Sequence, residues 1–138
     1  MSVVHGDCRV ILKTLNDASV DLVYLDPPFF TQKAHSLATR DNSAEYSFDD
    51  RWGSLDEYLS FMHQVLVQCQ RVLQGTGSIF LHCDKSASHH LRRLLDEVFG
   101  AEHFQSEIIW AYKRWSNAKK GLQNAHQTIY FYSQTGDF

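Results

Sequence analysis

The apolar positions along the chain follow two spacings, one typical of strands and one typical of helices. Four short runs rich in β-branched and aromatic residues predict strands at residues 20–25, 78–83, 107–112 and 128–132. A briefer run predicts a strand at Val3 and Val4. Apolar residues at helical spacing predict helices over residues 8–15, 54–74 and 86–99. The chain is therefore expected to alternate strand and helix through most of its length.

The ends of the predicted helices carry recognisable signals. Ser54 has the side chain of a helix N-cap, and Gly75-Thr76-Gly77 is expected to end the helix that begins there. Ser86 or Ser88 is expected to cap the last helix, which Gly100 closes.

The order of the elements predicts the α/β fold class. Strands that alternate with helices form a mostly parallel sheet with flanking helices. The last strand, at residues 129–132, is expected to be an antiparallel edge strand of that sheet. Residues 30–53 are polar and irregular, and they predict a long loop of the kind that often carries function.

Composition places the chain among compact globular proteins. It has 138 residues, of which 43% are hydrophobic and 21% are charged, so one buried core is expected and disorder is excluded. No apolar run approaches the roughly 20 residues of a membrane span, and three cysteines at unrelated spacings suit reduced thiols. We therefore expect a cytoplasmic protein with no membrane partner. The net charge of −3 gives no general affinity for nucleic acid, so any such contact must come from local features.

The strongest candidate site follows the predicted strand at residues 20–25. Asp26, Pro27, Pro28 and Phe29 stand at the carboxyl end of that strand, where open α/β sheets bind ligands. The carboxylate accepts hydrogen bonds, the prolines stiffen the backbone with carbonyls turned outward, and the aromatic ring offers a stacking surface. Such a set suits a planar ring that carries an exocyclic amine. The alternative is a strand-end turn with a solvated aspartate and a core phenylalanine.

Asp26-Pro27-Pro28-Phe29, placed after the strand VDLVYL, resembles the catalytic motif of S-adenosylmethionine-dependent amino-group DNA methyltransferases. The resemblance continues in order along nearly the whole chain. The further matching segments are residues 5–8 with Leu12, 50–52 with 58–59, 72–73 with 77–80, 82–84, 95–100, 108–110, and His126 with 130–133. The resemblance implies a partial Rossmann-like methyltransferase fold.

The resemblance also implies methyl transfer from S-adenosylmethionine to adenine N6 of a base flipped out of double-stranded DNA. In this interpretation the Asp26 carboxylate and the Pro27 carbonyl accept the amine hydrogens, Pro28 keeps the turn rigid, and Phe29 stacks on the base. Adenine is expected because cytosine-N4 members of the family usually carry serine in place of Asp26. Cytosine N4 is the alternative target. A cognate restriction endonuclease is a further expected partner.

Cofactor contacts are implied for Asp7, Cys8 and Asp26 by the same resemblance. For Asp7 the alternative is an N-cap for the helix that begins at Cys8. Asp50 and Trp52 lie in the predicted loop. They either border the base pocket or belong to an ordinary surface loop with one docked aromatic residue.

A basic segment interleaved with aromatic residues is the candidate DNA contact. Its charged residues are Lys113, Arg114, Lys119 and Lys120, and such a mixture suits phosphates and stacked bases. A solvated basic loop is the alternative. The histidine, cysteine and aspartate at residues 82–84 lack the spacing of metal ligands, so no metal site is predicted, and Cys83 is expected to be a buried core thiol.

The glycine-rich motif with which this family holds its cofactor has no match in the sequence. Gly75-Thr76-Gly77 follows a helix and precedes a strand, the reverse of a nucleotide-binding turn. Residues 1–138 are therefore interpreted as the N-terminal catalytic segment of a permuted methyltransferase, without its target-recognition region and cofactor motif, and inactive by itself. The alternative is a truncated, inactive protein that serves as an interaction or DNA-binding module. An exposed sheet edge is expected to promote self-association, for example as a homodimer.

Overall fold

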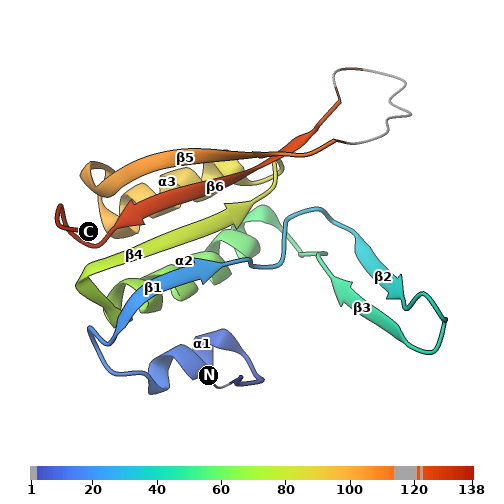
Figure 1. Cartoon of the computed structure of the whole chain (residues 1–138), viewed down its shortest axis with the longest axis horizontal. Coiled ribbons are helices and arrows are strands. Elements are labelled where there is room, and N and C mark those ends of the chain that lie inside the picture. The colour runs from blue at the N-terminus through green and yellow to red at the C-terminus, as the bar shows by residue number, and fades with distance from the viewer. Residues whose placement is uncertain (1–2, 114–120, 122) are drawn as a thin grey trace.

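The computed structural model describes residues 3–113, 121 and 123–138, which form a four-stranded sheet, a two-stranded hairpin and flanking helices (Figure 1). In chain order the elements are α1 (Cys8–Ile11), the 3-10 turn η1 (Leu12–Thr14), β1 (Val20–Leu25), β2 (Ala34–Ala38), β3 (Glu45–Asp49), α2 (Leu55–Val72), β4 (Leu73–Cys83), α3 (Ser88–Phe99), the 3-10 turn η2 (Ala101–His103), β5 (Phe104–Ala111) and β6 (His126–Ser133). Helices α2 and α3 cover one face of the four-stranded sheet, and the β2–β3 hairpin extends away from it (Figure 1).

The four-stranded sheet has the strand order β1-β4-β6-β5. β4 pairs with β1 in parallel, and β6 pairs antiparallel with both β4 and β5. Three of the four strands therefore run in one direction, which confirms the predicted α/β class and the mostly parallel sheet. The antiparallel strand is also confirmed, but β6 lies inside the sheet and β5 forms the edge. The chain reverses direction after β5, so β6 runs antiparallel beside β5. The other edge of β6 pairs with β4.

Helix α2 begins where its capping residues predict. The Ser54 side chain accepts a hydrogen bond from the Glu57 backbone N–H at 3.0 Å, and Glu57 Oε2 accepts one from the Gly53 N–H at 3.0 Å. The predicted end of this helix at Gly75 is wrong. The helix ends at Val72, and the chain enters β4 directly.

The glycine segment at residues 75–77 lies within β4 as an irregularity of the strand. The register against β1 shifts between Val20 and Leu22, so β4 carries extra residues there. Glycine suits this place, because a Cβ at Gly77 would lie 2.9 Å from the carbonyl oxygen of Gln74. The glycines therefore mark a break in strand register and not the end of a helix.

Three smaller predictions also differ from the structure. Residues 30–53 are not one loop, because β2 and β3 pair antiparallel within them. Val3 and Val4 form no strand, since their side chains are 94% and 66% exposed and no described strand pairs with them. Ala87 occupies the N-cap of α3 without a side-chain hydrogen bond, so neither predicted serine caps it, whereas Gly100 ends the helix with a φ of 93° as expected.

The β2–β3 hairpin closes through a turn built from polar side chains. Asp41 Oδ1 accepts hydrogen bonds from the hydroxyls of Thr39 and Ser43 at 2.6 and 2.7 Å, and these bonds lower the pKa of Asp41 to about 2. Asn42 adopts a positive φ of 54°, which asparagine tolerates better than most residues. The polar composition that predicted a loop therefore forms an ordered turn between two strands.

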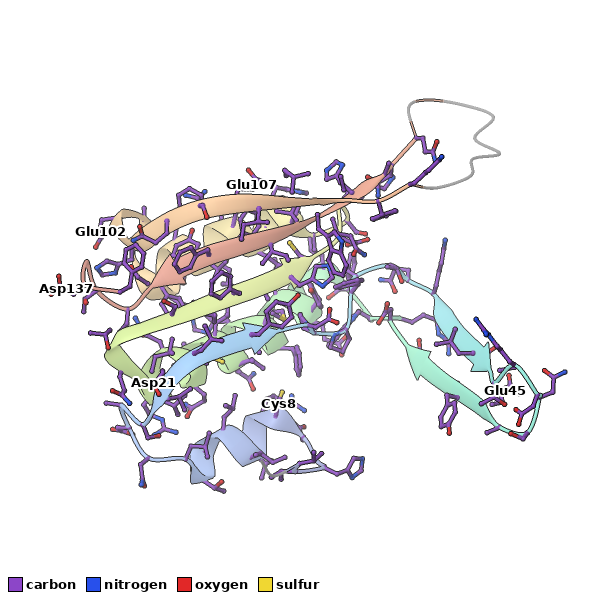
Figure 2. The ribbon with its side chains drawn as sticks, in the orientation of Figure 1. Cys8, Asp21, Glu45, Glu102, Glu107 and Asp137 are labelled. Atoms are coloured by element: carbon purple, nitrogen blue, oxygen red, sulfur yellow. The ribbon has the colours of Figure 1, made fainter. Side chains whose placement is uncertain are left out.

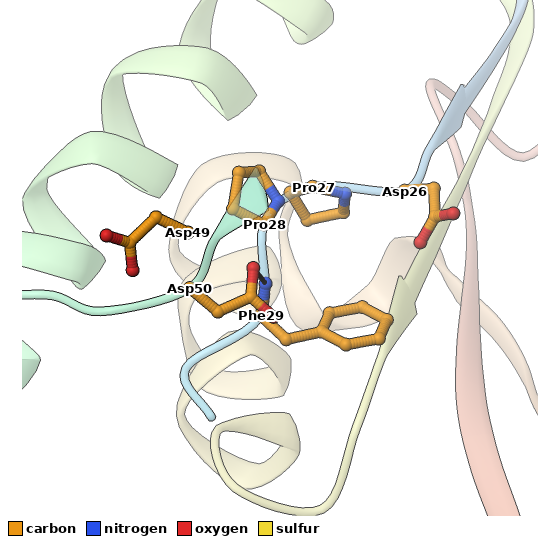
Figure 3. Close-up of a pocket in the computed structure, with 6 residues that line it drawn as sticks. All are labelled: Asp26, Pro27, Pro28, Phe29, Asp49 and Asp50. Carbon is orange, nitrogen blue, oxygen red and sulfur yellow. Dashed lines mark hydrogen bonds between the residues drawn. The ribbon is translucent and has the colours of Figure 1, made fainter. Parts of the chain in front are cut away.

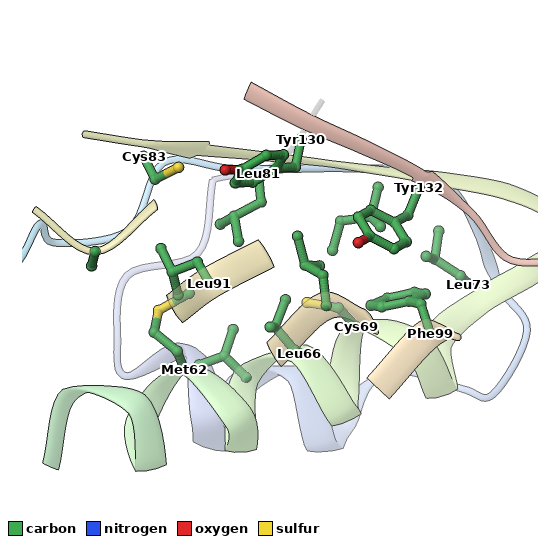
Figure 4. Close-up of a cluster of buried hydrophobic side chains, with 14 of the residues drawn as sticks. Met62, Leu66, Cys69, Leu73, Leu81, Cys83, Leu91, Phe99, Tyr130 and Tyr132 are labelled. Carbon is green, nitrogen blue, oxygen red and sulfur yellow. The ribbon is translucent and has the colours of Figure 1, made fainter. Parts of the chain in front are cut away.

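The hydrophobic core lies between the sheet and helices α2 and α3 (Figure 4). Leu66 and Leu91 are fully buried on the helix side, and Leu81 and Tyr132 on the sheet side. Cys83 is 1% exposed, which confirms the predicted core thiol, and burial raises the pKa of that thiol to about 12. None of the described helices is long and apolar enough to cross a membrane.

Strand β1 is more exposed than the buried strand that its sequence predicts. Val23 and Leu25 pack against the core, so the alternating side chains of Leu22 and Tyr24 point to the opposite face of the sheet. Leu22 is 58% exposed and Tyr24 is 51% exposed. β1 is also an edge strand of the described sheet, with β4 as its partner.

Replacing Leu66 by alanine is expected to lower the free energy of unfolding by about 2–5 kcal/mol, because it leaves a cavity in the core. Val67→Ala is the matched control on the same helix. The Val67 side chain is 37% exposed, and we expect its loss to change stability by about 0.5 kcal/mol or less. Urea denaturation followed by circular dichroism measures both variants. Equal losses would contradict the assigned core.

Candidate active site

The residues after β1 line a cavity at the carboxyl ends of two parallel strands. Asp26 directly follows β1, and the parallel strand β4 ends at Cys83 on the same edge of the sheet. The cavity has a volume of about 330 Å³. It is lined by Asp26, Pro27, Pro28, Phe29, Asp49 and Asp50 (Figure 3). The structure thus brings the four predicted motif residues together with two aspartates from the end of the β2–β3 hairpin.

Asp50 holds the chain that follows the two prolines. It is 3% exposed, and its carboxylate accepts a hydrogen bond from the Phe29 backbone N–H at 3.2 Å (Figure 3). The carboxylate also accepts one from the Thr31 hydroxyl at 3.2 Å. The Asp50 backbone N–H donates to the Lys33 carbonyl at 2.9 Å, and its carbonyl accepts from the Gln32 N–H at 3.1 Å. A buried carboxylate from the hairpin therefore fixes the wall of the cavity.

Of the two candidate loop residues, Asp50 lines the cavity and Trp52 does not. The Trp52 ring lies on α2, with its centroid 5.1 Å from that of Tyr58 and 5.2 Å from that of Phe61. Trp52 is therefore the docked aromatic residue of the alternative interpretation. Sequence reasoning missed the bond from Asp50 to the Phe29 backbone, because 21 residues separate the two partners.

Asp26 follows β1, the strand that carries Asp21 in Figure 2, and it keeps an accessible carboxylate beside a buried histidine. The Asp26 side chain is 61% exposed, and its Oδ1 lies 3.0 Å from Nδ1 of His82. His82 is 5% exposed, and its ring packs edge-on against Phe29 with 5.4 Å between centroids. Sequence reasoning missed His82 as a site residue. The strand register could have found it, because Leu25 pairs with Leu81 and the next residues of both strands then stand side by side.

The structure places Asp7 at the N-cap of α1. Asp7 Oδ1 accepts a hydrogen bond from the Arg9 backbone N–H at 2.8 Å, and Oδ2 pairs with the Arg9 guanidinium at 2.6 Å. The Arg9 hydrogen bonds lower the pKa of Asp7. Cys8 is exposed, although desolvation raises the pKa of its thiol. Neither Asp7 nor Cys8 lines the cavity, and the capping alternative accounts for the contacts of Asp7.

A second cavity of about 570 Å³ adjoins the first and shares the side chains of Phe29 and Asp50 with it. Its lining residues are Phe29, Thr31, Lys33, Asp50, Asp84, Lys85, Ser86, Tyr112, Asn124 and Gln127. Two lysines, two aspartates and two aromatic rings at its wall suit a ligand that has both a planar ring and polar groups.

One of the four predicted DNA contacts belongs to the described residues. Lys113 is exposed and follows Tyr112, which lines the second cavity. Arg114, Lys119 and Lys120 lie outside the described residues. Lys113, the first residue of the basic segment, therefore lies next to a residue of the second cavity.

A known protein family and known proteins match the sequence over most of its length. A family model for N6 and N4 methyltransferases, described as DNA methylase, matches residues 20–138. The chain is 40% identical over 84 residues to the type II methyltransferase M.HinfI of Haemophilus influenzae, a match that covers 58% of this chain and 23% of that protein. It is 28% identical over 138 residues to the type II methyltransferase M.KpnI of Klebsiella pneumoniae, covering 97% of this chain and 32% of that protein. The chain thus spans about a third or less of these relatives.

Solved structures match the fold. The cytosine-N4-specific PvuII DNA methyltransferase has a TM-score of 0.66 at 21% identity, and the match covers 96% of this chain and 48% of that chain. A DNA modification methylase from Thermus thermophilus, TTHA0409, solved in complex with S-adenosyl-L-methionine, has a TM-score of 0.60 at 17% identity, covering 96% of this chain and 53% of that chain. These likenesses confirm the predicted Rossmann-like methyltransferase fold.

Asp50→Ala removes the acceptor that holds the Phe29 N–H and the Thr31 hydroxyl, and we expect it to lower the free energy of unfolding by about 1–3 kcal/mol. Hydrogen exchange of the Phe29 amide is expected to become faster. Asp49→Ala is the neighbouring control, because the carboxylate of Asp49 forms an exposed ion pair with Arg51, and such pairs contribute little. Denaturation and NMR exchange test both variants. If they behave alike, Asp50 does not hold the loop.

Proposed function

Because the chain belongs to the N6/N4 family of DNA methylases, we propose that it is the catalytic segment of an enzyme that methylates adenine N6 in double-stranded DNA. One observation carries the proposal. Asp26, Pro27, Pro28 and Phe29 share a single cavity at the carboxyl end of β1. A charged hydrogen-bond acceptor and an aromatic ring at one cavity suit a planar base with an exocyclic amine.

The exocyclic amine of a base is a weak nucleophile, because its lone pair is delocalised into the ring. The Asp26 carboxylate, which is 61% exposed at the cavity, accepts one amine hydrogen, and the Pro27 carbonyl accepts the other. Two acceptors draw the nitrogen out of conjugation and stabilise the positive charge that develops on it. Phe29 stacks on the base, and Pro28 keeps the turn between them rigid.

The donor set of the cavity fits S-adenosyl-L-methionine as the cofactor. The cavity presents the exposed carboxylate of Asp26, and a sulfonium cation is favoured beside negative charge. When bound, this cofactor supplies an electrophilic methyl group. Asp26 is proposed as its contact at this cavity, and Asp7 and Cys8 are proposed as contacts for the remainder of the molecule.

Adenine N6 is proposed over cytosine N4 because of the residue type at the head of the motif. Asp26 stands where cytosine-N4 members of the family usually carry serine, and a carboxylate is the stronger, charged acceptor. The family model spans enzymes for both amines, and the PvuII enzyme is cytosine-N4-specific. Both reactions methylate an exocyclic amine in the same way. The identity of the methylated nucleoside is therefore what distinguishes them.

A base inside a duplex cannot reach the cavity, so the target nucleotide must leave the stack at a cost of a few kcal/mol. Lys113, Arg114, Lys119 and Lys120 are proposed to bind phosphates beside the flipped nucleotide. The place of Tyr112 at the second cavity supports this proposal, because the basic segment begins directly after it.

Residues 1–138 are proposed to be one part of the methyltransferase and inactive alone, with the cofactor glycine motif and the target-recognition region in other sequence. The chain spans 32% or less of the two curated relatives, which supports this division. Both relatives are named type II methyltransferases, which supports a cognate restriction endonuclease as a partner. The exposed edge of β1 supports self-association, as in a homodimer.

Asp26→Ala is expected to lower methyl transfer by about 100-fold or more, because it removes a charged acceptor from the amine while leaving the fold intact. The assay measures tritiated methyl groups that the whole protein incorporates into unmethylated DNA. Asp21→Ala is the control, since Asp21 is an exposed residue of β1 outside the cavity. Undiminished incorporation by a folded Asp26→Ala protein would refute the assignment.

Joint replacement of Lys119 and Lys120 by alanine is expected to weaken DNA binding at all sequences. Each lost phosphate contact flattens the dependence of log affinity on log salt by about 0.9, so the slope should fall by about 2. Lys13→Ala on η1 serves as the control for loss of positive charge. Binding titrations at several salt concentrations decide the matter. An unchanged slope would favour the solvated-loop alternative.

A further inference from the structure

His82 is a buried polar residue to which the proposed chemistry gives no role. It lies one residue before the end of β4 and is 5% exposed. Its ring packs against the rings of Phe29 and Trp110, with centroid distances of 5.4 and 5.3 Å. Burying a polar ring among aromatic side chains costs free energy unless its nitrogens are hydrogen-bonded. Both ring nitrogens of His82 therefore need partners.

Each ring nitrogen of His82 faces one polar side chain. Nε2 lies 2.9 Å from Oε1 of Gln127 on β6. Nδ1 lies 3.0 Å from Oδ1 of Asp26, but the two groups are not aligned as a hydrogen bond. The Asp26 side chain is 61% exposed, so it is free to turn toward the ring nitrogen. Three strands, β1, β4 and β6, therefore converge on this imidazole.

The chemistry of the two partners puts a proton on Nδ1. An ionised carboxylate only accepts hydrogen bonds, so the nitrogen that faces Asp26 must donate. The amide of Gln127 can turn either its oxygen or its NH₂ group toward Nε2. Gln127 can therefore form a hydrogen bond with Nε2 both when the ring is neutral and protonated on Nδ1 and when the ring is an imidazolium. In both forms the protonated Nδ1 is the ring nitrogen that lies nearest to Asp26.

We propose that His82 is a positioning residue for Asp26. Its Nδ1–H holds the carboxylate in the orientation that accepts the amine of the target base, and Gln127 holds the ring from the other side. The edge contact with Phe29 lets the same ring fix the stacking residue. The proposal rests on the proposed function for the role of Asp26, and His82 acts on methyl transfer through its two neighbours.

The first test reads the His82 ring directly. Nitrogen-15 NMR of the labelled chain, with His82 assigned by its loss in His82→Asn, is expected to show Nδ1 protonated. In Asp26→Ala the Nδ1 proton loses its acceptor, and we expect it to exchange faster with water or to move to Nε2. A neutral ring protonated only on Nε2 in the unsubstituted chain would overturn the proposal, whether or not the protein methylates DNA.

The second test separates positioning from packing. His82→Asn keeps a side-chain donor near the place of Nδ1, whereas His82→Phe keeps the ring volume without a donor. We expect His82→Phe to lower kcat about tenfold or more with KM changed by less than about twofold, and His82→Asn to recover most of that loss. Unchanged kcat in His82→Phe would overturn the proposal.

The two tests distinguish a failure of the proposed function from a failure of the contact between His82 and Asp26. Absence of methyl transfer in the unsubstituted whole protein would contradict the proposed function, while the NMR spectrum would still decide the contact between His82 and Asp26. A His82→Phe protein that does not fold would leave the decision to the same spectrum and to the kcat of His82→Asn. In that variant, a loss of about tenfold or more would count against the donor role.

Discussion

Parallel pairing of β1 with β4 is the constraint on which the candidate site depends. Leu25 pairs with Leu81, so the two strands end at the same edge and their next residues, Asp26 and His82, meet with 3.0 Å between oxygen and nitrogen. The core beneath the sheet maintains this register, because a slip of one residue would turn every side chain of a strand to the opposite face. An acceptor on a free surface turn would lack such support.

The β2–β3 hairpin supplies the second constraint. Asp50 follows β3 directly, and its buried carboxylate binds the Phe29 backbone from outside the four-stranded sheet. Strand register thus places Asp26, and the hairpin places Phe29. Acceptors and stacking surfaces help catalysis only when they are held in place before the substrate arrives. Two independent anchors on a four-residue motif meet that requirement.

Features with a local pattern could be predicted from the sequence, and features with distant partners could not. Ser54 and its helix, and the motif that begins at Asp26, are local, and both lie where the pattern places them. Gly75 and Gly77 led to a wrong helix end, because glycine occurs at strand irregularities as well as at helix ends. The contacts of Asp50 and His82 depend on pairing between segments far apart in the chain, which hydrophobic periodicity does not report.

In the proposed function, this cavity presents Asp26 to the amine of an adenine. The most direct test is the identity of the methylated nucleoside after the whole protein reacts with methyl-tritiated S-adenosylmethionine and unmethylated DNA, followed by complete digestion. We expect the label on N6-methyl-2′-deoxyadenosine. Label on N4-methylcytosine would contradict the assigned base, and the absence of label on any nucleoside would contradict methyl transfer to DNA itself.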